Sequence, residues 1–446
     1  MKSILLFGAG KSATVLIQYF LQYAKEEQWE LTVADADLSL AQSKINNHAA
    51  GRAVSVNLAD ITSINELVAE ASVVISMLPP AFHIVIARSC LALKKNFLTA
   101  SYIDEELLLL KEEIEKNGLL FIGEMGLDPG LDHMSAMRIF DRIRNAGGEI
   151  ISFKSHCGGL VAPEDDTNPW HYKVSWNPRN ITLAGSAGAV YKEDTITKWV
   201  PYTEVFENCP VIAVPALGSW ACYPNRNSLQ YIPIYQLETA KTVVRCTLRH
   251  PDFCTAWQYI VITGLTTVLD TGIIENFHSK SVSEWFTACL NFYTKSETFE
   301  DFLKRYVAPP DQQLVEHLFE YLGLFSEEPV PSAAKCSADI LQHLLETRLA
   351  LSPDDRDMII MIHEITFRLN NKTEQLFSSL IVKGDNALQT AMAKTVGLPL
   401  AIVTRLLLNG TIQLKGLHIP ILKEIYEPVL AVLEQNGIRF YEETYS

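Results

Sequence analysis

Residues 3–13 have the sequence SILLFGAGKSA. It joins a short apolar run that ends in glycine, as buried parallel strands do, to a segment whose apolar residues have helical spacing. Strand-like and helix-like segments continue to alternate up to about residue 125. Such alternation produces a parallel sheet, because each helix crosses over between two strands of the same sheet. The N-terminal part is therefore predicted to be a doubly wound parallel sheet.

The turn inside this stretch has the pattern G-x-G-x-x-A, formed by Gly8, Gly10 and Ala13. Gly8 permits a tight turn, Gly10 lets a pyrophosphate approach the backbone, and Ala13 lets the helix pack closely on the strand. Lys11 and Ser12 stand at the start of the helix, whose free N–H groups attract an anion. The context predicts a dinucleotide-binding Rossmann domain, and the alternative is a strand–turn–helix unit that binds no ligand.

Residues that follow the second and fourth predicted strands indicate the type of cofactor. Asp35 ends the second strand, and no basic residue follows it until Lys44. A carboxylate there accepts hydrogen bonds from a ribose 2′-hydroxyl and repels a 2′-phosphate, so NAD is predicted in preference to NADP. Leu78 and Pro79 follow the fourth strand, where the backbone would lie beside the nicotinamide. A proline-initiated helix is the alternative interpretation of these two residues.

The composition excludes several classes of protein. Of the 446 residues, 48% are apolar, and 37 Lys and Arg stand against 52 Asp and Glu, for a net charge of −15. This apolar content excludes global disorder, and the acidic balance argues against nucleic acid or an anionic membrane as a partner. No membrane-spanning segment and no secretory leader is expected. The eight cysteines form no C-x-x-C pair, which predicts no metal site, no disulfide framework and a reducing cytoplasm.

The pattern of elements changes along the chain and predicts three parts. Residues 1–125 form the dinucleotide-binding domain, and residues 385–446 are expected to return to it. Residues 126–251 together with 351–384 carry strand signals and are predicted to form a mixed-sheet α+β domain for substrate binding and dimerisation. Residues 252–350 have helical periodicity, which predicts a helical insertion between the two strand-bearing stretches.

A loop at the junction of these parts carries groups suited to acid–base chemistry. GLDPGLDHM, residues 126–134, places Asp128, Asp132 and His133 beside glycine and proline at the exit of a sheet, where clefts form. Asp128 is the favoured proton acceptor, although it also suits a simple turn before Pro-Gly. Asp132 equally suits a cap for the following helix.

Two further stretches offer groups that suit anionic substrates. Cys157 precedes Gly158 and Gly159, whose consecutive amides could form a nest for a carboxylate. A single cysteine is more often a small buried apolar residue than a catalyst. Arg226 stands on a predicted turn and suits bidentate binding of a carboxylate, with an exposed loop arginine as the alternative.

Several longer stretches resemble one family, the saccharopine reductases, which are the glutamate-forming saccharopine dehydrogenases and the C-terminal part of the animal bifunctional aminoadipic semialdehyde synthase. The similar stretches occur in order and cover nearly the whole chain. They are VVISMLPPAFH (73–83), TASY (99–102), GLDPGLDHM (126–134), CGGLVAPEDDTNPWHYKVSWNPR (157–179), YPNRNS (223–228), RCTLRH (245–250) and AMAKTVGLP (391–399).

The resemblance implies a fold, a reaction and a set of site residues. The implied fold is a Rossmann domain, a mixed-sheet domain and a helical insertion, in a homodimer. The implied reaction belongs to lysine metabolism and interconverts saccharopine with L-glutamate and 2-aminoadipate 6-semialdehyde through hydride transfer to or from a nicotinamide cofactor. The family positions for substrate contact and proton transfer fall on Tyr102, Asp128 and Cys157. The residues expected to bind substrate are Ser101, Gly158, Gly159 and Arg226.

The chain also departs from the family at several positions. Fungal members carry an arginine just after the second strand, where this chain has Ala36 beside Asp35. Trp170 replaces a small residue, and His156 stands where tyrosine is usual. Two alternatives therefore stay open at this point. One is a related imine reductase such as carboxynorspermidine dehydrogenase, and the other is a non-catalytic NAD-binding sensor.

Overall fold

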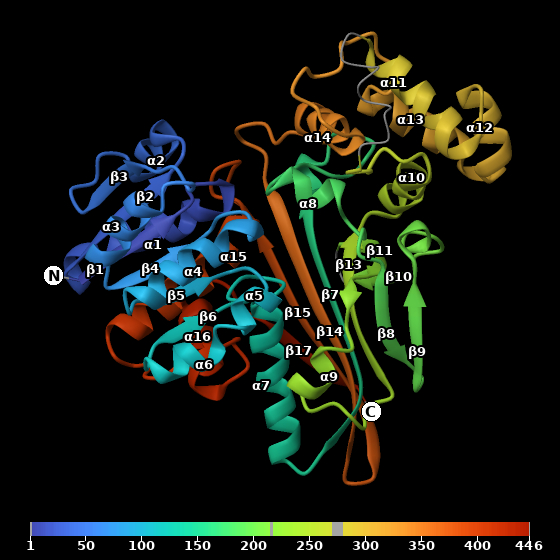
Figure 1. Cartoon of the computed structure of the whole chain (residues 1–446). Coiled ribbons are helices and arrows are strands. Elements are labelled where there is room, and N and C mark those ends of the chain that lie inside the picture. The colour runs from blue at the N-terminus through green and yellow to red at the C-terminus, as the bar shows by residue number, and fades with distance from the viewer. Residues whose placement is uncertain (1, 215–216, 270–279, 446) are drawn as a thin grey trace. The chain divides into compact units, whose positions relative to one another are not determined.

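The computed structural model describes residues 2–214, 217–269 and 280–445. The chain forms two compact units, coloured by residue number in Figure 1. Unit 1 consists of Met1–Ile150 and Phe367–Ser446, and unit 2 consists of Ile151–Thr366. The three-part division with boundaries near residues 125, 251, 350 and 384 stays a prediction.

Unit 1 is built on a parallel sheet, which within the described residues has seven strands in the order β16-β6-β5-β4-β1-β2-β3. Neighbouring strands pair in parallel, and the middle strand β4 is buried along its whole length, as expected where helices cover both faces. The predicted doubly wound sheet is therefore confirmed. The strands are β1 (Lys2–Phe7), β2 (Trp29–Asp35), β3 (Gly51–Ser55), β4 (Val73–Ser76), β5 (Asn96–Thr99), β6 (Leu120–Ile122) and β16 (Gly416–His418).

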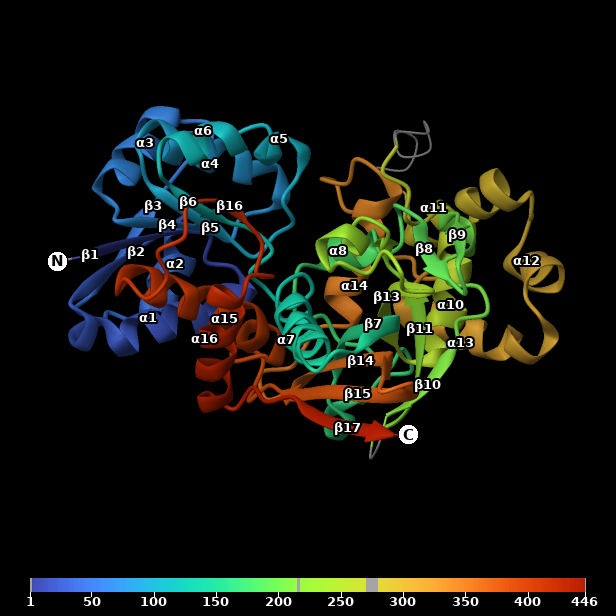
Figure 2. The same cartoon turned by 90° about the horizontal axis from the view of Figure 1, so that it is seen from below.

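Helices lie on both faces of this sheet, with α1, α2 and α15 on one face and α3, α4 and α6 on the other (Figure 2). The short turns η1 (Lys11–Ala13) and η2 (Pro80–Phe82) lead into α1 and α4. The helices of unit 1 are α1 (Thr14–Glu27), α2 (Leu38–Ile45), α3 (Ile61–Glu70), α4 (His83–Ala92), α5 (Glu105–Leu108), α6 (Lys111–Lys116), α7 (Leu131–Asn145), α15 (Ala391–Leu408) and α16 (Lys423–Gln435).

Helix α15 is continuous although it contains Pro399. By length and composition it is the one helix in the described part of the chain that would suit a membrane span, with a mean hydropathy of 1.5 over 18 residues. The sequence-based expectation of no such segment is wrong by this measure. However, 72% of that window is buried, and α15 packs against α1 inside unit 1. Its apolar character is that of a core helix.

The second sheet is mixed, as predicted. Across the described residues it has ten strands, seven of them on the path β10-β11-β13-β7-β14-β15-β17, with β8, β9 and β12 paired beside that path. Strand β13 pairs in parallel with β7 and antiparallel with β11. The strands are β7 (Glu149–Val161), β8 (Ala189–Glu193), β9 (Ile196–Val200), β10 (Val211–Val214), β11 (Gly218–Pro224), β12 (Arg226–Asn227), β13 (Thr242–Arg249), β14 (Asp357–Leu369), β15 (Lys372–Lys383) and β17 (Tyr441–Tyr445).

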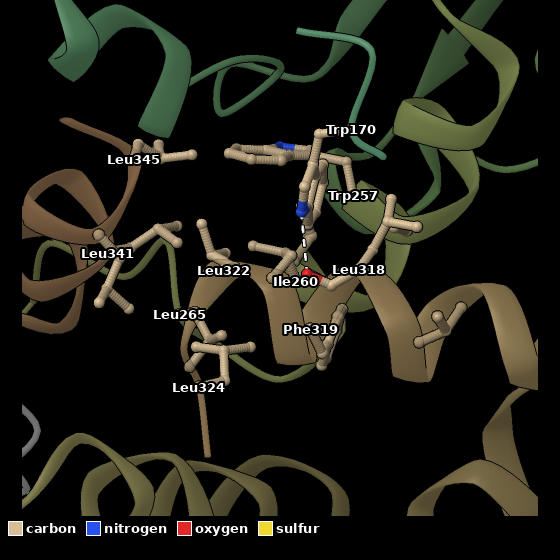
Figure 3. Packing of buried hydrophobic residues seen from close by; sticks show 14 of the residues in the cluster. Trp170, Trp257, Ile260, Leu265, Leu318, Phe319, Leu322, Leu324, Leu341 and Leu345 are labelled. Atoms are coloured by element: carbon tan, nitrogen blue, oxygen red, sulfur yellow. Dashed lines mark hydrogen bonds between the residues drawn. The ribbon is translucent and has the colours of Figure 1, made fainter. Parts of the chain in front are cut away.

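Apart from its strands, unit 2 is mainly helical, and its core is rich in large aromatic side chains, whereas β15 and β17 of the second sheet belong to unit 1. The buried indole of Trp170 packs edge-on against Trp257 and donates a hydrogen bond of 2.9 Å to the carbonyl of Leu318 (Figure 3). The unusual Trp170 is therefore a core residue here. The helices of unit 2 are α8 (Pro178–Thr182), α9 (Tyr231–Ile234), α10 (Pro251–Ile262), α11 (Val282–Cys289), α12 (Phe299–Tyr306), α13 (Gln312–Leu322) and α14 (Ser337–Arg348).

Candidate active site

The glycine-rich turn after β1 has the geometry of a dinucleotide site. Gly8 has a φ of +99°, and a Cβ atom there would lie 2.8 Å from the carbonyl oxygen of Met77, so only glycine fits. At Gly10 a Cβ would meet no atom within 4 Å, which leaves open space above the turn. Ala13 is buried at the start of α1. A pyrophosphate can therefore approach the backbone at Gly10 and the N–H groups that begin the helix.

The carboxylate of Asp35 is engaged by the backbone of its own chain. The N–H of Ala9 donates to Oδ2 at 2.7 Å, and the N–H of Asp37 donates to Oδ1 at 2.9 Å. The oxygen Oδ2 thus holds the glycine-rich turn in place through Ala9, and the oxygen Oδ1 holds the start of α2 through Asp37. Asp35 has a structural function that does not depend on the presence of a ribose hydroxyl.

A lysine lies close to the same turn. The ammonium of Lys44 donates a hydrogen bond to the hydroxyl of Thr14, and that hydroxyl donates to the carbonyl of Lys11 at 3.0 Å. Burial lowers the pKa of Lys44. No carboxylate in the described part of the chain forms an ion pair with this amine. A cation is therefore available beside the turn that would bind the cofactor.

A buried histidine links the ends of β4 and β5. The Nδ1 atom of His83 lies 2.8 Å from the hydroxyl of Ser76, and its Nε2 atom lies 2.7 Å from the hydroxyl of Ser101. Burial lowers the pKa of His83 to about 4, against the opposing effect of Asp104. The imidazole is therefore neutral near pH 7 and fixes the position of Ser101. His83 ends the stretch VVISMLPPAFH (73–83), but the sequence predicts no site role for this residue.

A second buried histidine holds the loop that carries Asp128. The Nε2 atom of His133 lies 2.8 Å from a carboxylate oxygen of Glu124, and its Nδ1 atom lies 3.6 Å from Asp132. Asp132 also accepts a hydrogen bond of 2.6 Å from the N–H of Gly130. These contacts fix both ends of the loop, while Asp128 itself is partly exposed. Asp132 is thus a support of the loop and not the N-cap of α7, since Gly130 occupies that position.

The predicted residues of unit 1 gather at one edge of the sheet. Ser101 and Tyr102 follow β5, and Asp128 follows β6, the neighbouring strand. Leu78 and Pro79 follow β4. Because the strands are parallel, these residues and the glycine-rich turn lie at the carboxyl edge, where ligands bind in such sheets.

Cys157 lies in unit 2 on β7 and is buried, with 6% of its surface exposed. It is in register with Thr247 of β13. Side chains alternate along a strand, so Arg245 and Arg249 of β13 lie on the same face as Cys157. Both arginines are buried, since only 4% of each is exposed. Both lie in the stretch RCTLRH (245–250), but no site role was predicted for them, although a spacing of four along a strand places two side chains on one face.

Both guanidinium groups lie against aromatic rings. Arg245 lies 4.4 Å from the centroid of Tyr231, and Arg249 lies 5.0 Å from that of Tyr172. Within the residues that the structure describes, Arg249 forms no ion pair with a carboxylate. The ring face stabilises such a buried cation. The N–H groups lie in the plane of the guanidinium, and their forked arrangement suits a carboxylate ligand.

The other predicted residues of unit 2 have a different geometry from the one expected. Gly158 and Gly159 lie within the extended strand β7. Consecutive N–H groups of a strand point in opposite directions, so these two cannot form an anion nest. A Cβ at Gly158 would lie 2.7 Å from the Cβ of Leu248, which explains this glycine by close packing. Arg226 lies in β12 and is exposed, and its role in binding substrate stays a prediction.

Two family models match the chain. "Saccharopine dehydrogenase NADP binding domain" matches residues 4–122, and "Saccharopine dehydrogenase C-terminal domain" matches residues 126–438. The chain is 32% identical over 452 residues to the saccharopine dehydrogenase [NADP(+), L-glutamate-forming] of Saccharomyces cerevisiae, covering 99% of each chain. The solved structure of that yeast enzyme in its apo form matches with a TM-score of 0.88 and 31% identity, covering 100% of both chains.

Longer proteins are similar over part of their length. The mitochondrial alpha-aminoadipic semialdehyde synthase of Bos taurus is 34% identical over 451 residues, which are 98% of this chain and 47% of that protein. The alpha-aminoadipic semialdehyde synthase of Arabidopsis thaliana is 33% identical over 439 residues, or 94% of this chain and 41% of that one. The chain thus spans less than half the length of these relatives and nearly the full length of the yeast enzyme.

These comparisons correct the predicted cofactor. The prediction of NAD is wrong, because the matching N-terminal model is an NADP-binding domain and the fungal relatives are named as NADP(+) enzymes. The physical reason lies in Asp35, whose two oxygens bind the amides of Ala9 and Asp37 and so serve the loops. Two saccharopine dehydrogenase models match residues 4–122 and 126–438, and the yeast saccharopine dehydrogenase is similar over its full length. The chain therefore belongs to the saccharopine dehydrogenase family.

Proposed function

We propose that this protein is an NADP-dependent saccharopine dehydrogenase that forms L-glutamate. The reaction is saccharopine + NADP⁺ + H₂O ⇌ L-glutamate + 2-aminoadipate 6-semialdehyde + NADPH + H⁺. The observation that carries the proposal is the full-length similarity to the yeast enzyme, with 99% of each chain covered and a TM-score of 0.88. The acid–base and cationic groups described above supply the chemistry that this reaction needs.

The cofactor would be held by the turn after β1 and by Lys44. Open space at Gly10 admits the pyrophosphate, and the first N–H groups of the helix bind it. The ammonium of Lys44, hydrogen-bonded to Thr14, supplies positive charge for the 2′-phosphate. When bound, the oxidised cofactor accepts the hydride from saccharopine.

Proton transfer would involve Asp128 and Tyr102 at the carboxyl edge of the first sheet. The substrate is a secondary amine, which must be deprotonated before a hydride can leave the adjacent carbon. Asp128 is suited to accept that proton, because it is partly exposed on a loop that buried contacts hold in place. Tyr102 follows β5 next to Ser101 and is suited to donate a proton when the imine is hydrolysed.

Recognition of the substrate would depend on cationic side chains of unit 2. Saccharopine carries three carboxylates, and the buried guanidinium groups of Arg245 and Arg249 lie on the same face of the sheet as Cys157. A guanidinium binds a carboxylate through two parallel hydrogen bonds. Cys157 is suited to relay protons beside these groups, and Arg226 is the further candidate for a carboxylate.

A test of the function is to incubate the purified protein with saccharopine and NADP⁺ and to identify the products by mass spectrometry. Glutamate and the semialdehyde are expected. Lysine and 2-oxoglutarate would indicate cleavage on the other side of the amine and would contradict the proposal. Carboxynorspermidine is the control substrate, and preferential turnover of it would favour the imine-reductase alternative. Absence of turnover, with NADPH binding retained, would favour a non-catalytic sensor.

The proposal also includes a homodimer in the cytoplasm. Support for the compartment comes from the cysteines, which are all free thiols, as expected in a reducing environment. Light scattering on the purified full chain measures the oligomeric state, and a mass of one chain would contradict the dimer.

A further inference from the structure

Three neighbouring strands of unit 2 place a histidine and two cysteines together. His156 of β7 is in register with Cys246 of β13, and Cys222 of β11 is in register with Leu248 of β13. Residues in register share a face of the sheet, and Leu248 is two positions from Cys246, so all three side chains lie on one face. This face is opposite to that of Cys157, because neighbouring residues of a strand point to opposite sides. The group formed by His156, Cys222 and Cys246 is thus separate from the candidate active site.

The three side chains offer ligand atoms at distances that suit one metal ion. One nitrogen of His156 and the two cysteine sulfurs all lie within 4.8 Å of one another. Bonds of about 2.3 Å to sulfur and about 2.0 Å to nitrogen around one zinc ion place ligand atoms roughly 4 Å apart. All three residues are buried, with exposed fractions of 3% for His156, 4% for Cys222 and 7% for Cys246. Only small side-chain movements would be needed to bind the ion.

The imidazole of His156 is oriented as metal-bound histidines are. Its Nε2 atom lies 2.8 Å from a carboxylate oxygen of Glu364, on β14. Its Nδ1 atom is buried, and no oxygen or nitrogen atom in the described part of the chain hydrogen-bonds to it, so that the thiol of Cys222 is its neighbour. Histidines that bind metals usually direct one nitrogen to the ion and the other to a carboxylate. A thiol is only a weak hydrogen-bond partner for a buried nitrogen, and a metal ion would satisfy that nitrogen better.

The positions of the two cysteines fit a shared metal ion better than they fit a disulfide. Cys222 and Cys246 are diagonal neighbours on paired strands, and diagonal positions are separated by roughly 7–8 Å between Cα atoms, whereas a disulfide requires less than about 7 Å. Both residues are free thiols in the structure. Sulfur atoms at such positions can still approach one ion between them.

We propose that His156, Cys222 and Cys246 bind one Zn²⁺ ion, with Glu364 orienting His156. Two thiolates and one imidazole match the preference of zinc for sulfur and nitrogen ligands, and they leave the fourth position of a tetrahedron for water or another ligand. Each thiol that binds the ion loses its proton to solvent, so that binding is an exchange of protons for the metal without any change of oxidation state. The ligands stand far apart in the sequence, on three strands, which is why no C-x-x-C motif announces them.

The test uses the full chain, freed of metal by a chelator and titrated with Co²⁺ and then Zn²⁺. Saturation at one Co²⁺ per chain is expected, with a thiolate-to-cobalt charge-transfer band that one equivalent of Zn²⁺ removes. A metal at the half-exposed group of His171, His250 and Asp252 would give no such band, because that group carries no thiol. Absence of the band in the wild-type protein would overturn the proposal.

Variants identify the ligands. Cys222→Ser and Cys246→Ser should each abolish the band, whereas Cys90→Ser, at a fully buried cysteine of unit 1, should retain it. Glu364→Gln should keep the band and weaken Zn²⁺ binding by about 10-fold to 100-fold, the usual effect of losing such a carboxylate. Retention of the band in both cysteine variants would contradict the assignment. If these variants fail to fold, X-ray absorption of the zinc-loaded wild-type protein decides, because two sulfur ligands support the site and a shell of oxygen and nitrogen alone overturns it.

Discussion

Lys44 is a half-buried cation whose hydrogen bond to Thr14 brings it to the start of α1. Replacement by methionine should therefore weaken the binding of NADPH and leave that of NADH nearly unchanged. The loss of one charged contact of about 1.4 kcal/mol corresponds to a tenfold decrease in the ratio of kcat/KM for NADPH to that for NADH. Lys25→Met, at an exposed position near the end of the same helix, is the matched control. An unchanged ratio would exclude Lys44 from recognition of the 2′-phosphate.

Asp128 is the residue on which the proposed proton transfer depends most. Asp128→Asn should lower kcat for saccharopine oxidation by roughly 10²-fold or more, the usual effect of losing a general base. Folding and NADPH binding should be retained, because the loop is held by Glu124, His133 and Asp132. Kinetics across pH are the measurement, with Asp60→Asn as the control at an exposed helix cap. A near-normal kcat with an unaltered pH profile would make Asp128 a turn residue only.

His83 should make the stability of unit 1 depend on pH. Burial lowers its pKa from 6.5 to about 4, so between these values the unfolded chain binds a proton that the folded chain does not. The free energy of unfolding should therefore fall as the pH falls from about 6.5 to about 4, by up to about 1.4 kcal/mol per pH unit from this group.

His83→Gln isolates that contribution, since an amide can still bond to Ser76 and Ser101 without titrating. The measurement is urea unfolding of wild type and variant at several pH values from about 4.5 to about 7.5. The difference in free energy of unfolding between the wild type and the His83→Gln variant should change across this pH interval. A constant difference would show that His83 does not titrate in the way described.

At the scale of elements, the contact between α15 and α1 supports the cofactor turn. Gly397 of α15 lies so close to α1 that a Cβ atom there would be 3.0 Å from the backbone nitrogen of Leu16 and 3.3 Å from the carbonyl oxygen of Ser12. A larger residue must push α15 away from the first turns of α1. The glycine of this C-terminal helix thus fixes the position of the helix that begins at the cofactor turn.

Gly397→Val should lower the free energy of unfolding by about 1–3 kcal/mol, as overpacking commonly does. It should also weaken NADPH binding more than Gly397→Ala does, because the added volume displaces the start of α1 further. Thermal unfolding and fluorescence titration with NADPH measure the two effects. Leu388→Val, at an exposed side chain just before the same helix, is the control. Equal NADPH affinity in both glycine variants would contradict the coupling between these helices.

Regular patterns in the sequence predict most elements of the first sheet, because each strand and helix there is specified by local periodicity and by glycine or proline at its ends. Exceptions arise where tertiary packing dominates. Helix α15 passes through Pro399 without ending, since its apolar residues are buried in unit 1. Strand β7 continues through Gly158, where packing against Leu248 requires a glycine in an extended conformation.

At the scale of the whole molecule, the family and the mixed architecture could be predicted from motifs that lie close together in the sequence. Features that depend on residues from separate strands could not be predicted from the sequence. Arg249 and the two cysteines Cys222 and Cys246 acquire their neighbours only when the second sheet forms. The cofactor was mispredicted for the same reason, because the amides that bind Asp35 are not visible in the sequence.

In the proposed reaction, a hydride moves between NADP and the carbon of saccharopine that becomes the aldehyde. The measurement uses saccharopine in which both hydrogens of that carbon are deuterium, and it follows the label by mass spectrometry after turnover with NADP⁺. We expect one deuterium in the reduced cofactor, one on the aldehyde carbon of the semialdehyde, and unlabelled glutamate. Unlabelled reduced cofactor, with lysine that keeps both deuterium atoms, would show cleavage at the other carbon of the amine and would rule out the proposed reaction.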